Sequence, residues 1–183
     1  ELFAQNILDW MDENKIVRIH IFGYSMGGYV ALYLASLYPE RVDRVFTFAT
    51  KFDWSPEIAN AQTKLLNPEK ILEKLPAFAQ SLEKRHQLHN WKEVLRKTSS
   101  MMISMGEKPP ISQSLLSSVT CPVLLAVGDK DKMVSVDETK RVSELLQSAR
   151  MCIMSNTSHP IEEIDILNLC DVVSDFFTNP SSK

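Results

Sequence analysis

The segment around Ser25 carries the residue types that nucleophilic chemistry needs. An apolar run, Ile19–Phe22, leads directly into Gly23-Tyr24-Ser25-Met26-Gly27-Gly28, and a helical pattern follows. Gly23 and Gly27 flank Ser25 two residues to either side, where a strand that turns straight into a helix leaves no room for side chains. We expect this turn to strain the backbone of Ser25 and to hold its hydroxyl out from the sheet. A serine so placed suits acyl transfer.

The start of the next helix could stabilise the negative charge that develops in such a reaction. The backbone amide of Met26 is expected at the helix N-terminus, where the helix dipole favours an anion. We therefore predict this amide as one donor of an oxyanion hole.

The elements that would position Ser25 alternate between strands and helices. Apolar runs of strand length are centred on Val17–Phe22, Val45–Thr50, Pro122–Gly128 and Arg150–Ser155. Helical patterns follow several of them, with Ser135 and Asp165 as predicted N-caps. Strands that alternate with helices are typical of a parallel sheet.

Between Lys51 and about Ser118 the chain contains helical patterns and breakers but no convincing strand. Asn67 and Pro68 predict the start of one helix, which Pro76 kinks or divides. Asn90 predicts the start of a second helix, which should end at Gly106. The pattern indicates a helical insertion between two strands, although ordinary packing helices are the alternative.

Composition excludes several classes of function. The 183 residues fit one domain, with 44% hydrophobic and 23% charged residues and a formal net charge of −3. The sequence contains no polybasic block of the kind that binds nucleic acid, and it contains no apolar run long enough to cross a bilayer. Three cysteines and four histidines lack metal-ligand spacing. We expect no metal, no cofactor, no nucleic acid or membrane partner, and a cytoplasmic protein with reduced thiols.

The sequence G-Y-S-M-G-G-Y-V-A-L, followed by Tyr38–Val42, resembles the nucleophile segment of the α/β-hydrolase family, and of its capped serine esterases in particular. The resemblance implies an α/β-hydrolase fold, with a mostly parallel sheet flanked by helices and a helical cap inserted between core strands. It implies a core of residues 1–50 and 119–183 and a cap of residues 51–118.

The resemblance also implies the partners of Ser25. Gly128-Asp129-Lys130-Asp131-Lys132-Met133-Val134 resembles the family pattern G-x-x-D-x-x-V, which assigns the acid to Asp131 and leaves Asp129 as a turn residue. Asp53 is the rival acid. His159 follows the fourth strand, where the family has its general base, although Ser158 replaces the usual preceding glycine.

The other three histidines are not predicted to be catalytic. His20 lies inside the strand before Ser25 and is expected to pack there, while His86 and His89 fall in the predicted cap as exposed residues or substrate contacts.

In the family, the helix that begins this chain comes just before the nucleophile strand. The resemblance therefore implies that an N-terminal portion with the first strands is absent from the 183 residues. Either the second oxyanion donor belongs to that portion, or this chain is not an efficient enzyme. The strand before Ser25 would also have a free edge. We expect that the missing segment or a partner chain covers this edge.

These observations favour a serine hydrolase that cleaves small to medium carboxylic esters through a Ser25-His159-Asp131 triad. Two alternatives stay open: a lyase or carbon–carbon bond hydrolase of the same fold, similar to menaquinone-synthesis enzymes and using Arg85 or Arg96, and a non-catalytic small-molecule receptor. Candidate substrate-pocket residues are aromatic or methionine side chains: Tyr24, Phe52, Trp54, Phe78, Trp91, Met101, Met105 and Met133.

Overall fold

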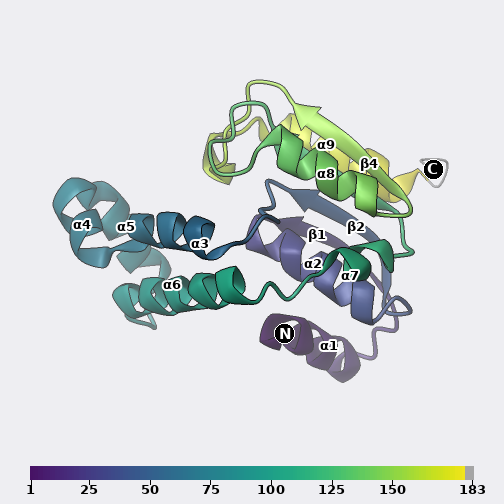
Figure 1. Ribbon diagram of the computed structural model, residues 1–183, viewed down its shortest axis with the longest axis horizontal. Coiled ribbons are helices and arrows are strands. Elements are labelled where there is room, and N and C mark those ends of the chain that lie inside the picture. The colour runs from purple at the N-terminus through teal and green to yellow at the C-terminus, as the bar shows by residue number, and fades with distance from the viewer. Residues whose placement is uncertain (180–183) are drawn as a thin grey trace. The chain divides into compact units, whose positions relative to one another are not determined.

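The computed structural model describes residues 1–179 and contains a four-stranded parallel sheet (Figure 1). The strands are β1 (Ile19–Tyr24), β2 (Val42–Phe48), β3 (Val123–Gly128) and β4 (Ala149–Met154), in the spatial order β1-β2-β3-β4. All three pairings are parallel. Each of the four predicted strands is present, with ends that differ from the predicted ones by at most three residues.

Register brings the carboxyl ends of the strands to one edge of the sheet. Tyr24 pairs with Phe48, and Gly128 pairs with Met154. In an open parallel sheet, this edge is where loops converge on a site. The predicted site residues Ser25, Asp131 and His159 all lie in the segments that follow these strand ends.

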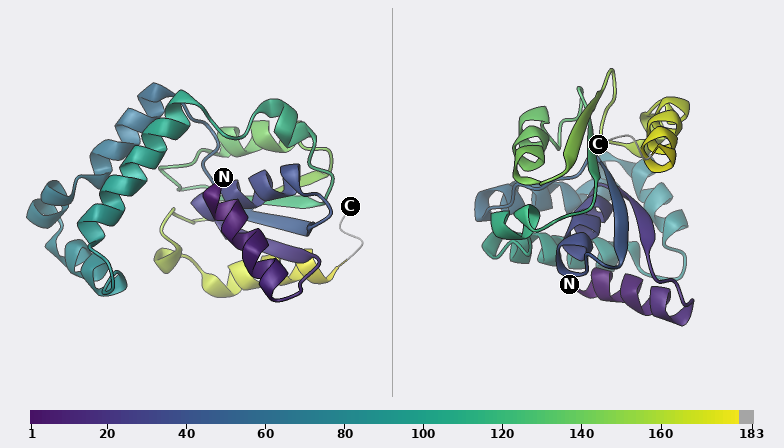
Figure 2. Two further views of the ribbon diagram at one scale, coloured as in Figure 1. Left: turned by 90° about the horizontal axis from the view of Figure 1, so that it is seen from below. Right: turned by 90° about the vertical axis from the view of Figure 1, so that its right-hand side faces the viewer.

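Helices cover both faces of the sheet, which explains the continuous apolar run of β3 and the fully buried second half of β2. On one face, Val45, Val123 and Leu125 pack with residues of α1 (Leu2–Glu13), α2 (Met26–Leu37), α7 (Gln113–Ser117) and α8 (Val136–Leu145). On the other, Phe46, Phe48 and Leu124 pack with α9 (Ile166–Thr178). The right-hand view of Figure 2 shows α8, in green, and α9, in yellow, on opposite sides of the sheet.

The chain divides into two compact units, each described by itself below. The core unit comprises residues 1–52 and 111–179 of the described chain, and the helical unit comprises residues 53–110. The helical unit is inserted between β2 and β3. It contains α3 (Pro56–Thr63), the short 3₁₀ helix η1 (Lys64–Leu66), α4 (Pro68–Lys74), α5 (Pro76–Arg85) and α6 (Trp91–Glu107).

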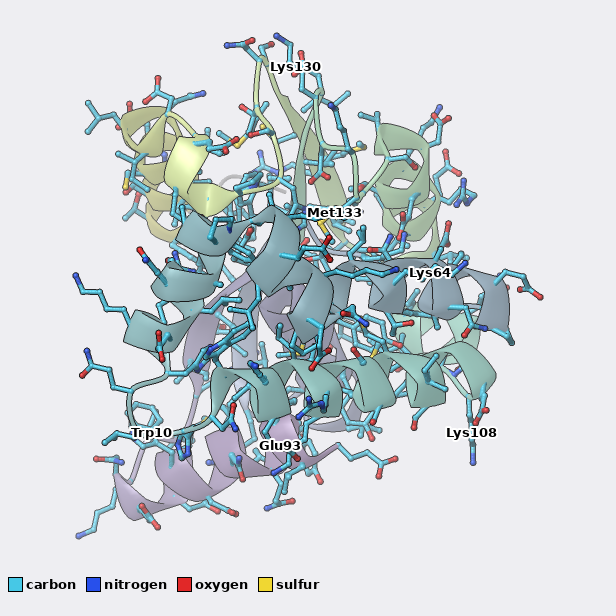
Figure 3. All side chains as sticks on the ribbon, turned by 90° about the vertical axis from the view of Figure 1, so that its left-hand side faces the viewer. Trp10, Lys64, Glu93, Lys108, Lys130 and Met133 are labelled. Carbon is cyan, nitrogen blue, oxygen red and sulfur yellow. The ribbon has the colours of Figure 1, made fainter. Side chains whose placement is uncertain are left out.

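Local sequence signals explain the ends of these helices. The side chains of Asn67 and Asn90 accept hydrogen bonds from the first-turn amides of α4 and α6, so both predicted caps are confirmed. Pro76 is the first residue of α5 and divides the predicted run into two helices. Figure 3 labels Glu93 and Lys108 at the two ends of α6.

The helix predicted to end at Gly106 ends one residue later, at Glu107. Gly106 lies inside the last turn of α6, and a Cβ there would come within 2.6 Å of the Ala59 Cβ and 2.7 Å of the Ser55 carbonyl oxygen. Gly106 therefore allows α3 and α6 to approach closely, a role that depends on a helix far away in sequence.

At the margin of the sheet, β1 pairs with β2 alone, so it is an edge strand of the described chain. Among residues 1–179, no helix combines the length and the apolar character needed to span a membrane.

Candidate active site

Ser25 occupies a sharp turn between β1 and α2. Its backbone dihedral angles are φ 51° and ψ −117°, a region that residues other than glycine rarely adopt. The Ser25 amide donates to the Phe48 carbonyl at 2.8 Å, and the Ser25 carbonyl accepts from the Gly28 amide at 3.1 Å. These bonds to β2 and α2 hold the strained residue in place. The predicted strain at Ser25 is confirmed.

The glycines around the turn play different roles from those expected. A Cβ on Gly23 would lie 2.5 Å from the backbone of Gly27 and Gly28, so Gly23 is sterically required. The same prediction for Gly27 is wrong, because a Cβ there meets no atom of the described residues within 4 Å. Gly28 is the second crowded position: its Cβ would lie 2.0 Å from Thr50 Oγ1 and 3.0 Å from the Gly23 carbonyl oxygen.

The structure brings Ser25, His159 and Asp131 into one hydrogen-bonded row. Ser25 Oγ lies 3.3 Å from His159 Nε2, and His159 Nδ1 lies 2.8 Å from Asp131 Oδ2. The side chain of Asp131 is inaccessible to solvent and that of His159 is 13% exposed. With Nδ1–H donating to the carboxylate, Nε2 is left as the acceptor for the serine hydroxyl.

Asp131 is held as a carboxylate by several donors. Its Oδ1 accepts from the amides of Met133 at 2.7 Å and Val134 at 2.9 Å. Burial alone would raise the pKa of Asp131, but the hydrogen bond with His159 and those from the two amides outweigh it and lower that pKa. The carboxylate is thus ionised at neutral pH.

The loop before His159 is pinned to the segment that carries Asp131. Asp129 accepts from the Thr157 amide at 3.2 Å, and the Lys130 amide donates to the Thr157 carbonyl at 3.0 Å. A Cβ on Gly128 would lie 2.0 Å from that carbonyl oxygen, so only glycine allows this approach. Asp129 therefore acts as the predicted turn residue.

Ser158, the departure from the family pattern, is accommodated by the loop. Its hydroxyl donates to the Glu163 carboxylate at 3.0 Å. The extra side chain thus finds a partner within its own loop, next to His159.

Tyr24 contacts His159 in a way that sequence reasoning missed. Its hydroxyl donates to the His159 carbonyl at 2.9 Å, and the two rings are 5.6 Å apart. The sequence indicates Tyr24 only as one of the aromatic candidates for the substrate pocket. Its hydrogen-bonding partner lies 135 positions later in the chain.

The remaining candidates lie in several places. His20 stacks on Phe177 at 5.3 Å and lies 3.4 Å from Asp43, which agrees with its predicted packing role. His86 and His89 belong to the helical unit, as does Asp53. It is Asp131, rather than its rival Asp53, that forms a hydrogen bond with His159.

Met26 is the first residue of α2, as predicted. The amide of a first helical residue has no carbonyl partner within its own helix and carries part of the positive end of the helix dipole. It is thus chemically suited to bind an oxyanion next to Ser25.

The predicted pocket residues divide between the two units. Phe52 and Met133 lie in the core unit with Tyr24; Phe52 packs beside Tyr29, and Met133 is 37% exposed on the loop after β3 (Figure 3). The others belong to the helical unit: Trp54, Phe78, Trp91, Met101 and Met105. Trp91 is buried in a cluster with Ile71, Leu82 and Leu95. A structural packing role therefore accounts for Trp91.

A parallel sheet flanked by helices, with a serine on a sharp strand-to-helix turn, defines a protein of the α/β-hydrolase fold. Comparison with known proteins agrees. The family model described as the alpha/beta hydrolase fold matches residues 2–81. The human serine hydrolase BPHL is 21% identical over 166 residues, which are 85% of this chain and 53% of that protein.

Solved structures share the same fold. The lip1 protein of Acinetobacter baumannii AYE superposes with a TM-score of 0.76 at 23% identity, over 95% of this chain and 66% of that one. A thermophilic esterase from Thermogutta terrifontis gives a TM-score of 0.68 at 21% identity, over 95% and 70% of the two chains. The chain therefore has the α/β-hydrolase fold. It spans about half the length of its human relative.

Proposed function

We propose that this chain is a serine hydrolase that cleaves small to medium carboxylic esters through an acyl-enzyme. One observation carries the proposal: the Ser25 hydroxyl, the His159 imidazole and the Asp131 carboxylate form a hydrogen-bonded row with separations of 3.3 and 2.8 Å. This arrangement supplies the nucleophile, base and orienting acid that acyl transfer requires.

The reaction would begin with attack by Ser25 Oγ on the ester carbonyl carbon. His159 Nε2 takes the hydroxyl proton while the new Oγ–C bond forms and the carbonyl electrons move onto oxygen. The Met26 amide, at the start of α2, would donate a hydrogen bond to this oxyanion. Collapse then breaks the bond to the leaving alcohol, which receives the proton from His159.

Water completes the cycle by the same route. His159 removes a proton from water as the water oxygen attacks the acyl carbon, and Ser25 leaves with that proton to restore its hydroxyl. Asp131 stays ionised throughout, orients the imidazole and stabilises its charged form. No cofactor takes part in these steps.

We further propose that the helical unit serves as a cap that selects the substrate. Its insertion point supports this role, because the chain enters it from the loop after β2, at the same strand ends from which the triad residues come. The predicted pocket residues of this unit, such as Met101 and Phe78, remain candidates for substrate contact.

The lyase or carbon–carbon hydrolase alternative gains less support. It would need an arginine for an anionic substrate, yet Arg96 is already within 3.1 Å of Glu69 and 4.0 Å of Glu93. The receptor alternative has less support because ligand binding alone does not require a hydrogen-bonded row of Ser25, His159 and Asp131.

Hydrolysis of p-nitrophenyl acetate and butyrate tests the proposal. We expect the wild-type chain to release nitrophenolate and Ser25→Ala to lose at least about a thousandfold in kcat/KM, because the variant lacks the nucleophile. Ser36→Ala is a matched control, since Ser36 donates to a carbonyl of its own helix and should keep full activity. Equal hydrolysis by wild type and Ser25→Ala would exclude the proposed mechanism.

A further inference from the structure

The hydroxyl of Tyr24 connects the segment that carries Ser25 to the backbone of His159, the two residues between which the proposed proton transfer takes place. Tyr24 is the last residue of β1 and directly precedes Ser25. Its hydroxyl donates to the carbonyl of His159, the residue whose imidazole lies 3.3 Å from Ser25 Oγ. The two hydrogen bonds therefore close a ring that runs through the nucleophile, the base and Tyr24.

The Tyr24 side chain is itself held in place. Its ring stacks on Phe48 at 5.9 Å with an interplanar angle of 29° and packs against the His159 ring at 5.6 Å. Phe48 is fully buried at the end of β2. The side chain of Tyr24 thus contacts both the sheet, through Phe48, and the loop that carries His159.

The bond acts at the carbonyl of His159 itself, between the contacts that hold the residues on either side of it: Ser158 donates to the Glu163 carboxylate, and the Pro160 carbonyl accepts from the Glu163 amide. The hydrogen bonds to Asp129 and Lys130 fix the backbone at Thr157, two residues before His159. After His159 comes Pro160, which has no amide proton to donate. The bond from Tyr24 fixes the carbonyl between these two points, and with it the direction from which the imidazole leaves the backbone.

Tyr24 also stays a donor over a wide pH range. Burial raises the pKa of its hydroxyl; a hydrogen bond involving the Ile161 backbone lowers it, and the nearby charges of Glu162 and Asp131 raise it further. The net effect is a pKa above the usual tyrosine value, so the hydroxyl keeps its proton wherever the triad would operate.

We propose that Tyr24 is a positioning residue, whose hydrogen bond to the His159 carbonyl keeps the imidazole aligned between Ser25 and Asp131. This inference rests on the proposed hydrolase function and assigns Tyr24 a role other than substrate contact.

The test is Tyr24→Phe, which removes the hydroxyl and keeps the ring contacts with Phe48 and His159. One net hydrogen bond corresponds to a three- to tenfold effect, so we expect kcat to fall by about that factor while KM changes less than about twofold. The rate of phosphonylation of Ser25 by a small fluorophosphonate should fall by the same factor, because that reaction needs the imidazole but no ester pocket.

The matched control is Tyr29→Phe. Tyr29 is buried, and its hydroxyl accepts from the Ile111 amide at 3.1 Å, so the variant loses one hydrogen bond away from the triad. We expect Tyr29→Phe to keep the wild-type kcat. Equal kcat values for wild type and Tyr24→Phe, or equal losses in both variants, would overturn the proposal.

A spectroscopic measurement separates this inference from the proposed function. The Nδ1 proton of His159 that faces Asp131 can be followed by proton NMR in the absence of substrate. We expect it to exchange with water several-fold faster in Tyr24→Phe than in wild type and Tyr29→Phe. An unchanged exchange rate overturns the positioning role, whereas an inactive wild type with the expected exchange rates overturns only the hydrolase function.

Discussion

Asp131 shows at the scale of one residue how the site depends on its surroundings. Its carboxylate accepts hydrogen bonds from two backbone amides and from the His159 imidazole, and its side chain is inaccessible to solvent. A buried carboxylate is costly unless it is paired in this way. The same contacts that would orient His159 therefore stabilise the folded chain, and this stabilisation must depend on pH.

We predict that Asp131→Asn lowers the free energy of unfolding by about 1–3 kcal/mol at pH 7, the range for a charge-assisted hydrogen bond. The pKa of Asp131 is lower in the folded chain than in the unfolded chain, where it is near 3.9. Its contribution is thus fully present well above about pH 4 and is lost as the pH falls through the lowered folded-state value.

Urea unfolding at a series of pH values checks this prediction. The difference between wild type and Asp131→Asn should shrink as the solution becomes more acidic. Asp171→Asn, an exposed position on α9, should change the unfolding free energy by less than about 0.5 kcal/mol at every pH. A difference that grows on acidification would contradict the assigned stabilising contacts.

At the scale of elements, the turn from β1 into α2 depends on contacts with β2. Gly28 faces the segment after β2, where Thr50 leaves no space for a methyl group, whereas Gly27 faces no atom of the described chain within 4 Å. The two adjacent glycines of one helix therefore form a natural pair for comparison.

We predict that Gly28→Ala lowers the free energy of unfolding by about 2 kcal/mol or more, because the added methyl group overpacks against Thr50, Thr47 and the Gly23 carbonyl. Gly27→Ala should leave stability unchanged or raise it by up to about 1 kcal/mol, since alanine favours a helix. Urea unfolding of the two variants measures both effects. Equal losses would show that the space around α2 differs from that described.

This pair also shows what the sequence could and could not predict. Apolar runs predicted all four strands, and local caps such as Asn67 and Asn90 predicted helix starts, because those signals are contained within a few residues. The crowding of Gly28 and Gly106 depends on segments distant in sequence, so spacing alone could not indicate it.

In the candidate site, too, local signals could be predicted from the sequence and contacts between distant segments could not. Ser25 is marked by its own turn, and the resemblance to the α/β-hydrolases placed Asp131 and His159, which the structure brings together. The hydrogen bond from Tyr24 to His159 joins residues 135 positions apart, and no local pattern could indicate it.

At the scale of the whole molecule, the core unit alone holds all three residues of the proposed triad. Ser25, Asp131 and His159 come from three segments at the carboxyl ends of β1, β3 and β4. The helical unit is inserted between β2 and β3. The three segments that carry the triad residues follow β1, β3 and β4, so the insertion interrupts none of them. Activation of the serine should therefore be measurable apart from the choice of ester.

Intact mass spectrometry after treatment with a fluorophosphonate tests this activation most directly. The reagent reacts with an activated serine and requires no particular ester-binding pocket. We predict that the wild-type chain gains the mass of one phosphonyl group and that Ser25→Ala gains none. A wild-type chain that stays unmodified, or a Ser25→Ala chain that is labelled equally, would contradict the claim that Ser25 is the nucleophile.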